Sequence, residues 1–319
     1  MVAQATGEMM TSPKRTHPYN GVYPIAPTPF REDETIDLEG QKRVLDCMID
    51  QKVDGICILA NYSEQFLLTD AERDQLAVTC LEHIAGRVPV IVTCSHFSTR
   101  VSVERAKKAE ALGADMIMVM PPYHGVGLKA SNVGNFTYFE SLAKGISIPI
   151  MVQDAPLSGI SLSVRFLTEI AQKIPQVCYF KIETPGAAAK LRDLIAAGGQ
   201  CVQGPFDGEE SITLMADLNA GATGTMPSAL LPDLIGPVVT RYLSGDKDVA
   251  TELYNAILPL INFENRQCGL RAAKIAMKEG GVIKHETVRH PLEAVHPETR
   301  AELLRYAAKL DLLALHWGK

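Results

Sequence analysis

Several features of extracellular, membrane and nucleic-acid-binding proteins are scarce or absent in this sequence. The seven cysteines include no CxxC pair, which argues against a disulfide framework and a cysteine zinc site. No apolar run approaches membrane-spanning length, and residues 1–20 lack the hydrophobic core of a signal peptide. Lysine and arginine form no dense run, and the net charge is −6. We therefore predict a cytoplasmic protein without a membrane or nucleic-acid partner, and a flexible segment over residues 1–20.

The remaining composition is that of a folded chain with a large core. Hydrophobic residues make up 46% and charged residues 21%, so disorder is not expected. From residue 21 onward, short apolar runs recur every 20 to 35 residues or so, which is about the period of a strand followed by a crossover helix. We predict eight strands, at residues 21–26, 55–60, 88–93, 114–120, 148–153, 177–183, 200–204 and 222–225.

Helix signals occupy the segments between these runs. Thr69 and Glu72 have the spacing of a capping box, and Gly113 stands where a glycine ends a helix. Eight apolar strands alternating with helices favour a parallel (β/α)8 TIM barrel. A doubly wound open sheet is the alternative, but no GxGxxG motif follows the first strand.

The strand signal stops near residue 230. Residues 248–262, 268–279 and 297–315 show helical periodicity, separated by glycine and proline pairs. We predict a barrel over residues 21–235 and a C-terminal helical extension over residues 236–319, packed on the barrel and long enough to bury apolar surface against a neighbouring subunit.

One lysine interrupts the apolar run at residues 177–183. Because side chains alternate along a strand, Tyr179, Lys181 and Glu183 share one face, and Phe180 and Ile182 share the other. Burial without a partner would lower the pKa of a lysine and leave a neutral amine that can form a Schiff base with a carbonyl group. Two alternatives remain open: the lysine head reaches water, or Glu183 pairs with it and raises its pKa.

Polar residues collect at the predicted carboxyl ends of the strands, where barrel enzymes hold their active sites. Their convergence around an inward lysine favours a Schiff-base site. They are Thr28, Asn61, Tyr62, Ser63, Glu64, His96, Tyr123, His124, Gln153, Asp154, Glu183, Asp207, Gly208 and Glu209.

A metal-dependent aldolase is a rival interpretation of the same residues. His96, His124, Asp154 and Glu183 could hold a divalent cation, but they show neither HxH nor HxxxH spacing. We therefore expect no metal site. Acidic residues after the seventh strand, including Glu209 and Glu210, would repel a phosphate, so an unphosphorylated substrate is favoured.

The motifs resemble those of the dihydrodipicolinate synthase / N-acetylneuraminate lyase family. The resemblance runs from Gly21 to about Arg271 and is carried by GVYPIAPTPF at residues 21–30, LGAD at 112–115 and GATG at 221–224. It implies a TIM barrel, a Schiff-base lysine at Lys181, no separate cofactor and a homo-oligomer, with tetramers common in the family. Tyr123 matches a family tyrosine that is often contributed across a subunit interface, and the resemblance makes it a catalytic residue.

Two departures from the family pattern bear on the activity. The loop that holds the substrate carboxylate is Gly-Thr-Thr-Gly-Glu in most members, whereas this chain has Ala-Asn-Tyr-Ser-Glu, so Asn61, Tyr62 and Ser63 inherit that role. A family tyrosine that transfers protons is replaced by Gln153, whose amide cannot carry a proton near neutral pH. Proton transfer must then come from Tyr123, Tyr62, His96 or Glu183.

These departures are similar to those of family members that dehydrate a 2-keto-3-deoxy sugar acid. We expect such a small molecule to be the substrate and His96, Gln153, Glu183 and Gly208 to contact it beside the loop of residues 61–63. Another 2-keto-3-deoxy acid aldolase or dehydratase, or a catalytically weak sugar-acid-binding relative, remains an alternative.

Overall fold

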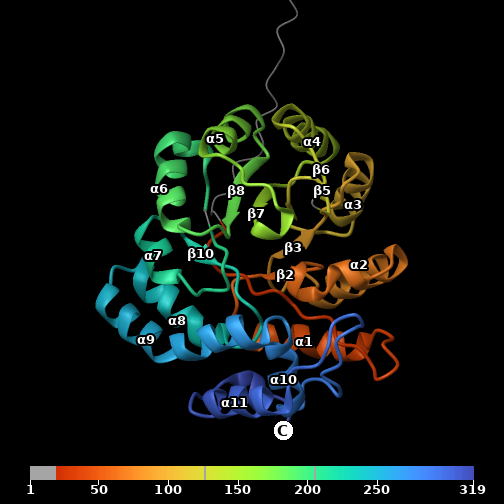
Figure 1. The fold of residues 1–319 in the computed structure, drawn as a ribbon, viewed down its shortest axis with the longest axis vertical. Helices are drawn as coiled ribbons and strands as arrows, with labels where there is room; N and C mark the ends of the chain where they lie inside the picture. Colours follow the sequence, from red (N-terminus) through yellow and green to blue (C-terminus); the bar gives the residue numbers. More distant parts are fainter. Residues whose placement is uncertain (1–18, 126, 205) are drawn as a thin grey trace, which may run out of the picture.

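The computed structural model describes residues 19–125, 127–204 and 206–319, so the expected flexible segment falls almost wholly outside the described residues. Within these ranges, eight parallel strands curl into a barrel surrounded by helices (Figure 1). The sheet order is β1-β10-β9-β8-β7-β4-β3-β2, and a parallel bridge between Ile25 and Cys57 joins the chain after β1 to β2. The predicted TIM barrel is therefore confirmed.

Seven of the eight predicted strands are found at their expected places, although most are shorter than the apolar runs. The barrel strands are β1 (Gly21–Val22), β2 (Ile56–Ile58), β3 (Val90–Thr93), β4 (Met116–Val119), β7 (Ile150–Asp154), β8 (Val177–Ile182), β9 (Phe206–Asp207) and β10 (Gly224–Thr225). A small antiparallel hairpin, β5 (Tyr123–His124) and β6 (Leu128–Lys129), follows β4 outside the barrel sheet.

The prediction of the seventh strand at residues 200–204 was wrong. Residues Gly199–Cys201 form a 3-10 turn, and Gly204 adopts a positive φ of 54°, so the ladder begins only at Phe206. Within the predicted range, the Gln203 amide still donates to the Cys178 carbonyl oxygen over 2.8 Å. The apolar run thus lies beside β8 without forming a regular strand.

Side-chain alternation divides the barrel into two buried layers. Tyr179 packs in the barrel interior, whereas Phe180 and Ile182 pack in the layer between strands and helices, as the sequence predicts. The interior is rich in methionine and aromatic residues: Tyr19, Tyr23, Ile25, Cys57, Ala60, Ile91, Met116, Met118, Met151, Cys178, Tyr179, Phe206 and Met226. Lys181 lies one inward position beyond Tyr179, nearer the carboxyl end of β8.

Helices α1 to α7 follow barrel strands. The helix α2 begins with the predicted capping box, in which Thr69 and Glu72 each accept a hydrogen bond from the other's backbone amide. These helices are α1 (Leu38–Asp50), α2 (Asp70–Ile84), α3 (Thr99–Ala111), α4 (Asn132–Gly145), α5 (Val164–Lys173), α6 (Ala187–Gly198) and α7 (Leu214–Asn219). They are joined by α8 (Pro232–Leu243), which closes the ring of helices (Figure 1).

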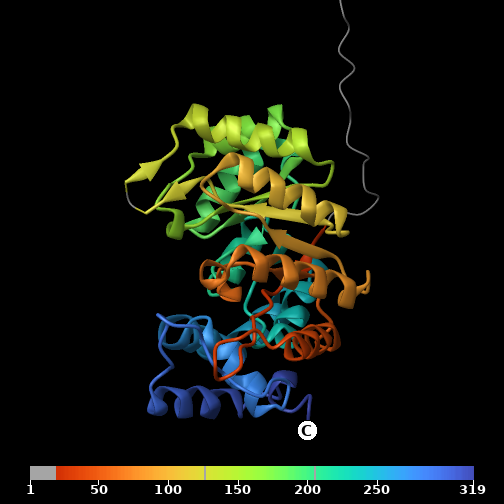
Figure 2. The ribbon, with the colours of Figure 1, turned by 90° about the vertical axis from the view of Figure 1, so that its right-hand side faces the viewer.

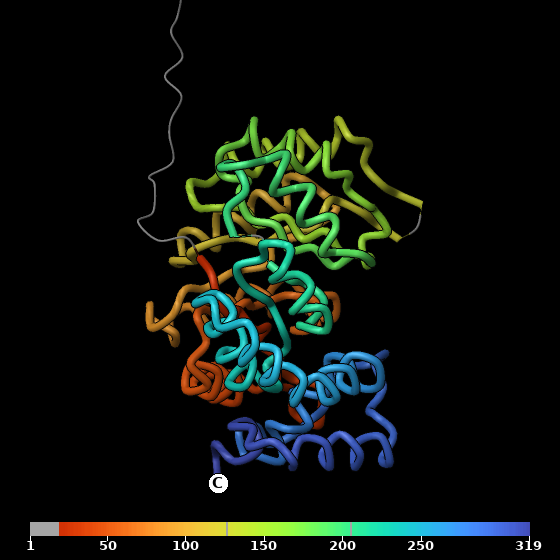
Figure 3. The backbone as a smooth tube through the Cα atoms, turned by 90° about the vertical axis from the view of Figure 1, so that its left-hand side faces the viewer, coloured from red at the N-terminus to blue at the C-terminus, as the bar shows by residue number. Residues whose placement is uncertain are grey.

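The C-terminal part of the chain is helical, as expected. It contains α9 (Lys247–Phe263), a π-helical turn (Glu264–Cys268), α10 (Arg271–Glu279) and α11 (Pro297–Ala307). The predicted helix at 297–315 ends early, because the chain turns so that the Leu313 amide donates to Asp233 of α8 over 2.9 Å. Figures 2 and 3 show α10 and α11 (blue) at one end of the molecule, beside α1 (red-orange). The domain limits proposed from the sequence stay a prediction.

A buried ion pair joins this C-terminal part to the loop after β2. Lys274 of α10 and Glu64 of the loop bond to each other, and both side chains are 0% exposed. Lys274 also donates to the Thr287 carbonyl oxygen (2.9 Å), and the Arg289 amide donates to the second oxygen of Glu64 (3.0 Å). Phe30 covers the lysine, with its ring centre 4.5 Å from Nζ. Each buried charge is thus balanced by a partner and hydrogen bonds.

We predict that Lys274→Met lowers the free energy of unfolding by about 3–5 kcal/mol, because the substitution leaves the Glu64 carboxylate buried without its cation. The matched control is Lys278→Met on the same helix, where the pair with Glu286 is exposed and 3.6 Å long; this change should cost at most about 1 kcal/mol. Urea unfolding of both variants measures the difference, and equal midpoints would contradict the structural role of the buried pair.

Candidate active site

Lys181 lies inside the barrel near the carboxyl end of β8 and is 1% exposed. Its Nζ is 2.8 Å from Oε1 of Glu183, and the same oxygen accepts a hydrogen bond from the Gln153 amide nitrogen of β7 (2.8 Å). The neighbouring strands set this arrangement, because Gln153 pairs in register with Lys181. The three predicted residues therefore meet at one end of the barrel.

The protonation state of Lys181 differs from the expected neutral amine. Burial alone would lower its pKa, but the carboxylates of Glu183 and Glu210 outweigh burial and hold the pKa above its usual value. Lys181 is therefore an ammonium ion paired with Glu183, which was the alternative left open by the sequence. An ammonium ion must lose a proton before its nitrogen can attack a carbonyl group.

Gly208 lies directly against Glu183. A Cβ atom at this glycine would stand 2.5 Å from Cγ of Glu183 and 2.8 Å from the carbonyl oxygen of Ile182. The first contact would push the Glu183 side chain, and the second is with fixed backbone. Gly208, predicted as a substrate contact, thus also leaves the space that Glu183 occupies.

Two short 3-10 turns, Asn61–Ser63 and Gln65–Leu67, form the loop after β2. The Ser63 hydroxyl donates to the Ala26 carbonyl oxygen (2.7 Å) and accepts from the Ala60 amide (3.1 Å), so it is used within the loop. Asn61 accepts from the Gln65 side chain over 2.7 Å. Tyr62 packs against the barrel interior. The loop thus uses the side chains of Ser63 and Asn61 in internal hydrogen bonds and packs Tyr62 against the barrel interior.

Three carboxyl groups surround Tyr62. Burial raises the pKa of its phenol, and the charges of Glu210, Glu264 and Glu183 raise it further. Burial also raises the pKa of Glu264 to about 8, although a hydrogen bond from Ser228 opposes the shift. For Glu210, burial and the charges of Glu183, Glu264 and Asp207 raise the pKa well above its usual value, against the opposing charge of Lys181. Of these carboxyl groups, Glu264 is therefore largely protonated near neutral pH.

Glu264 was not predicted as a site residue. It lies in the C-terminal π-helical turn, far from any strand end in sequence, and only the packing of that turn on the barrel brings it to the mouth. An isolated acidic residue after an amphipathic helix gives no signal of burial in the sequence.

His96 and Tyr123 occupy a different place from Lys181. Both line a cavity of about 390 Å³ beside the β5–β6 hairpin, together with Gln65, Phe66, Leu68, Arg73, Ser95, Phe97, Arg105, Met120, Pro121, Pro122, His124 and Gly125. His96 is exposed and accepts from the Ser98 amide over 2.9 Å. Burial, with the charge of Arg105, lowers the pKa of His96. Burial raises the pKa of Tyr123, which is half-buried.

The four residues of the rival metal site do not come together. Asp154 points away from the barrel interior. Its carboxylate pairs with Lys190 and accepts a hydrogen bond from the Leu162 amide over 3.3 Å. His96 and His124 lie by the separate cavity, and Glu183 lies by Lys181. Among the described residues, no group of three histidine, cysteine or acidic side chains could hold a metal ion.

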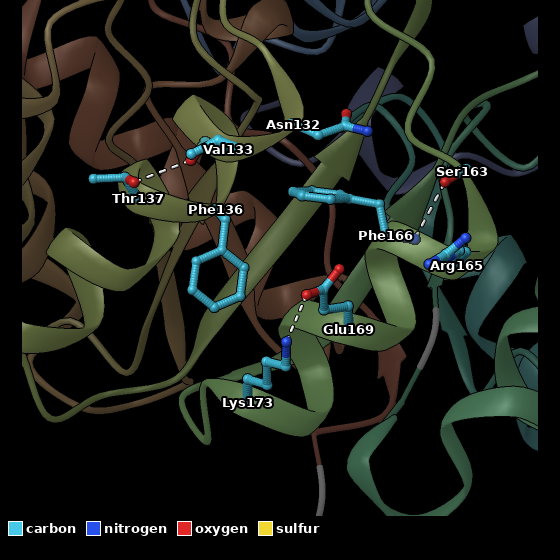
Figure 4. Close-up of a pocket in the computed structure, with 9 residues that line it drawn as sticks. All are labelled: Asn132, Val133, Phe136, Thr137, Ser163, Arg165, Phe166, Glu169 and Lys173. Atoms are coloured by element: carbon cyan, nitrogen blue, oxygen red, sulfur yellow. Dashed lines mark hydrogen bonds and ion pairs between the residues drawn. The ribbon is translucent and has the colours of Figure 1, made fainter.

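A further hollow of about 450 Å³ lies between α4 and α5 on the outside of the barrel (Figure 4). Phe136 and Phe166 face it, and Lys173 bonds to Glu169 at its edge over 2.6 Å. None of the predicted site residues lines this hollow. The chemistry-bearing residues are instead those around Lys181.

The sequence of this chain matches a known family. The family model described as the dihydrodipicolinate synthetase family covers residues 18–310, and the chain belongs to this family.

No described helix is long and apolar enough to cross a membrane.

Individual relatives narrow the comparison. L-2-keto-3-deoxyarabonate dehydratase of Azospirillum brasilense is 54% identical over 309 residues, which cover 97% of this chain and all of that protein. 4-Hydroxy-tetrahydrodipicolinate synthase 1 of Halalkalibacterium halodurans is 29% identical, covering 86% of this chain and 92% of that protein. The crystal structure of a Pseudomonas aeruginosa protein assigned as a dihydrodipicolinate synthetase has a TM-score of 0.86 and 29% identity, covering 91% and 99% of the two chains. The family resemblance read from the sequence is confirmed.

We predict that Gly208→Ala lowers kcat/KM by about 100-fold, because a displaced Glu183 would lose its hydrogen-bond distance to Lys181, and misplaced catalytic groups cost roughly this much. The matched control is Gly236→Ala in α8, where a Cβ atom meets nothing within 4 Å. Steady-state kinetics of both variants test the expectation. If the two substitutions have equal effects on kcat/KM, the close packing of Gly208 on Glu183 is unimportant for the site.

Proposed function

We propose that the chain is a Schiff-base dehydratase that converts L-2-keto-3-deoxyarabonate into 2-oxoglutarate semialdehyde. The observation that carries this proposal is the amine of Lys181, buried inside the barrel with Glu183 at 2.8 Å as its proton acceptor. The name of the relative with 54% identity supports the substrate. The reaction would serve L-arabinose degradation, and it uses no cofactor beyond the covalent bond to Lys181.

The first chemical step joins Lys181 to the C2 carbonyl carbon of the substrate. Glu183 takes a proton from the ammonium, and the free amine attacks C2. A second proton passes from the attacking nitrogen to the C2 oxygen, and the proton on Glu183 then goes to the resulting C2 hydroxyl, which leaves as water and gives a protonated imine. Glu183 returns to its carboxylate form beside the new imine. The pair seen in the structure thus supplies both a nucleophile and its base.

The second step removes a proton from C3. The imine draws electrons from the C3–H bond, and the regenerated Glu183 carboxylate accepts the proton to leave an enamine. Gln153 fixes the position of Glu183 through its amide nitrogen, while its own carbonyl oxygen is buried and has no hydrogen-bond partner among the described residues. An unpaired buried acceptor is costly, so we propose that a substrate hydroxyl donates to it.

The loop of residues 61–63 is proposed to bind the substrate carboxylate, as the family resemblance implies. Because the Ser63 hydroxyl is used inside the loop, Tyr62 and Asn61 are the side chains that can contact the substrate. Tyr123 and His96 would act only from the neighbouring cavity. The homotetramer expected from the family stays a prediction.

Borohydride treatment in the presence of the 2-keto acid should add one reduced substrate mass to the chain, and peptide mapping should place it on Lys181. Lys181→Met should remove both the adduct and turnover, because Lys181 is the lysine that pairs with Glu183 among the described residues. Lys144→Met, at an exposed ion pair with Glu140, is the control and should behave as the unchanged protein. An adduct on another lysine would refute the proposed nucleophile.

Product analysis separates the dehydratase from an aldolase on the same scaffold. Semialdehyde formation, with no release of pyruvate, is expected, because Gln153 replaces the tyrosine that would transfer protons. Pyruvate together with an aldehyde as the main products would contradict dehydration. Adduct formation without either product would identify a sugar-acid-binding relative.

A further inference from the structure

Loss of the C4 hydroxyl requires a proton donor that the groups at C2 and C3 do not supply. Glu183 and Lys181 act on the carbonyl carbon and its neighbour, and Gln153 cannot transfer a proton. A hydroxide ion is a poor leaving group, so a general acid must protonate this oxygen as the bond breaks. The following inference rests on the proposed function and concerns only this later step.

We propose that Glu264, buried at the barrel mouth and hydrogen-bonded by Ser228, is the general acid that protonates the leaving C4 hydroxyl. It would be the group that takes over proton transfer in a chain with a glutamine at position 153.

The fold places Glu264 at the catalytic end of the barrel. Ser228 lies three residues beyond β10 and forms a parallel bridge with Ile25, so it marks the carboxyl end of that strand. Glu264 is the first residue of the π-helical turn that follows α9. Such turns are frequent at functional sites. Glu264 lies near enough to Tyr62 and Glu210 to perturb both, and Glu210 in turn perturbs Lys181. Ser228 thus holds the Glu264 carboxyl at the same end of the barrel as Lys181.

The surroundings of Glu264 favour a neutral carboxyl group. Its side chain is 1% exposed, and among the described residues it forms no ion pair with a lysine, arginine or histidine. The Ser228 hydroxyl donates to Oε1 and accepts from the Leu230 amide over 3.1 Å, which fixes its direction. The proton of the acid therefore resides on Oε2. Burial raises the pKa of Glu264 to about 8, which keeps the acid form available at neutral pH.

The proposed step balances as follows. The enamine nitrogen re-forms its double bond to C2, the C2–C3 electron pair moves to form a C3–C4 double bond, and the C4–O bond breaks. The departing oxygen receives its proton from Glu264 and leaves as water, and Glu264 becomes a carboxylate. Loss of a C5 proton and return of a proton to C3 then convert the product to an enol of the C5 aldehyde, and Glu264 regains its proton from solvent.

Glu264→Gln should keep the buried volume and a hydrogen bond to Ser228 but abolish proton donation. We expect kcat to fall by about 100-fold or more, the usual contribution of a general acid. Borohydride adduct formation on Lys181 and deuterium exchange at C3 in heavy water should continue, because both precede the loss of the C4 hydroxyl. The control is Glu104→Gln in α3, which removes an exposed 3.0 Å ion pair with Arg100 outside the site; its kcat should stay within about twofold of the unchanged protein.

The outcomes separate this inference from the proposed function. Turnover of Glu264→Gln within about threefold of the unchanged protein would overturn the role of Glu264, since a general acid contributes more. Loss of the Lys181 adduct in this variant would also overturn it, because the defect would then precede elimination. Failure of the unchanged protein to form an adduct would instead overturn the proposed function.

A pH profile of the unchanged protein tests the inference without any substitution. A general acid must be protonated, so the single-turnover rate of elimination should be level below pH about 8 and fall about tenfold for each further pH unit. Glu264→Asp, which keeps the acid on a shorter side chain, should retain this alkaline limb at a lower rate, and Glu264→Gln should lack it. An alkaline limb that is unchanged in Glu264→Gln would exclude Glu264 as the donor.

Discussion

An ammonium ion inside an apolar barrel is the constraint on which the site depends. Lys181 shares the barrel interior with methionine and aromatic side chains, so its charge is tolerable only with a carboxylate in contact. Glu183 provides that carboxylate, and Gln153 fixes it from the neighbouring strand. The small residue at position 208 is required by the same pair, because any side chain there would occupy the space of Glu183.

The C-terminal helices are part of this arrangement because their buried groups reach the barrel mouth. Lys274 neutralises Glu64 in the loop that we propose to bind the substrate carboxylate, and Glu264 packs against Ser228 at the end of β10. The two acidic residues differ in what surrounds them. Glu64 is paired with a cation, whereas the side-chain partner of Glu264 among the described residues is a hydroxyl group, which suits the proton donor that we propose.

The sequence predicted what depends on local pattern. Strand alternation placed Lys181 and Glu183 on one face and Phe180 on the other, because the period of two survives in any buried strand. The range of the seventh strand was wrong, since backbone turns at Gly199 and Gly204 decide where the ladder starts. The sequence left the charge of Lys181 open between a neutral amine and a pair with Glu183. The burial of Glu264 could not be predicted from the sequence, because it depends on contacts between distant segments.

The glutamine at position 153, where the family pattern has a tyrosine, changes which residues can transfer protons in the site. A tyrosine can transfer protons, whereas in the mechanism that we propose the amide leaves each proton to a separate carboxyl group. Burial without a cation suits Glu264 to donate, and contact with an ammonium suits Glu183 to accept. An elimination takes a proton from one carbon and gives one to the oxygen on the next, and we propose that Glu183 and Glu264 divide these two transfers. Aldol cleavage would instead need a base at the C4 hydroxyl, and a neutral buried acid cannot provide it.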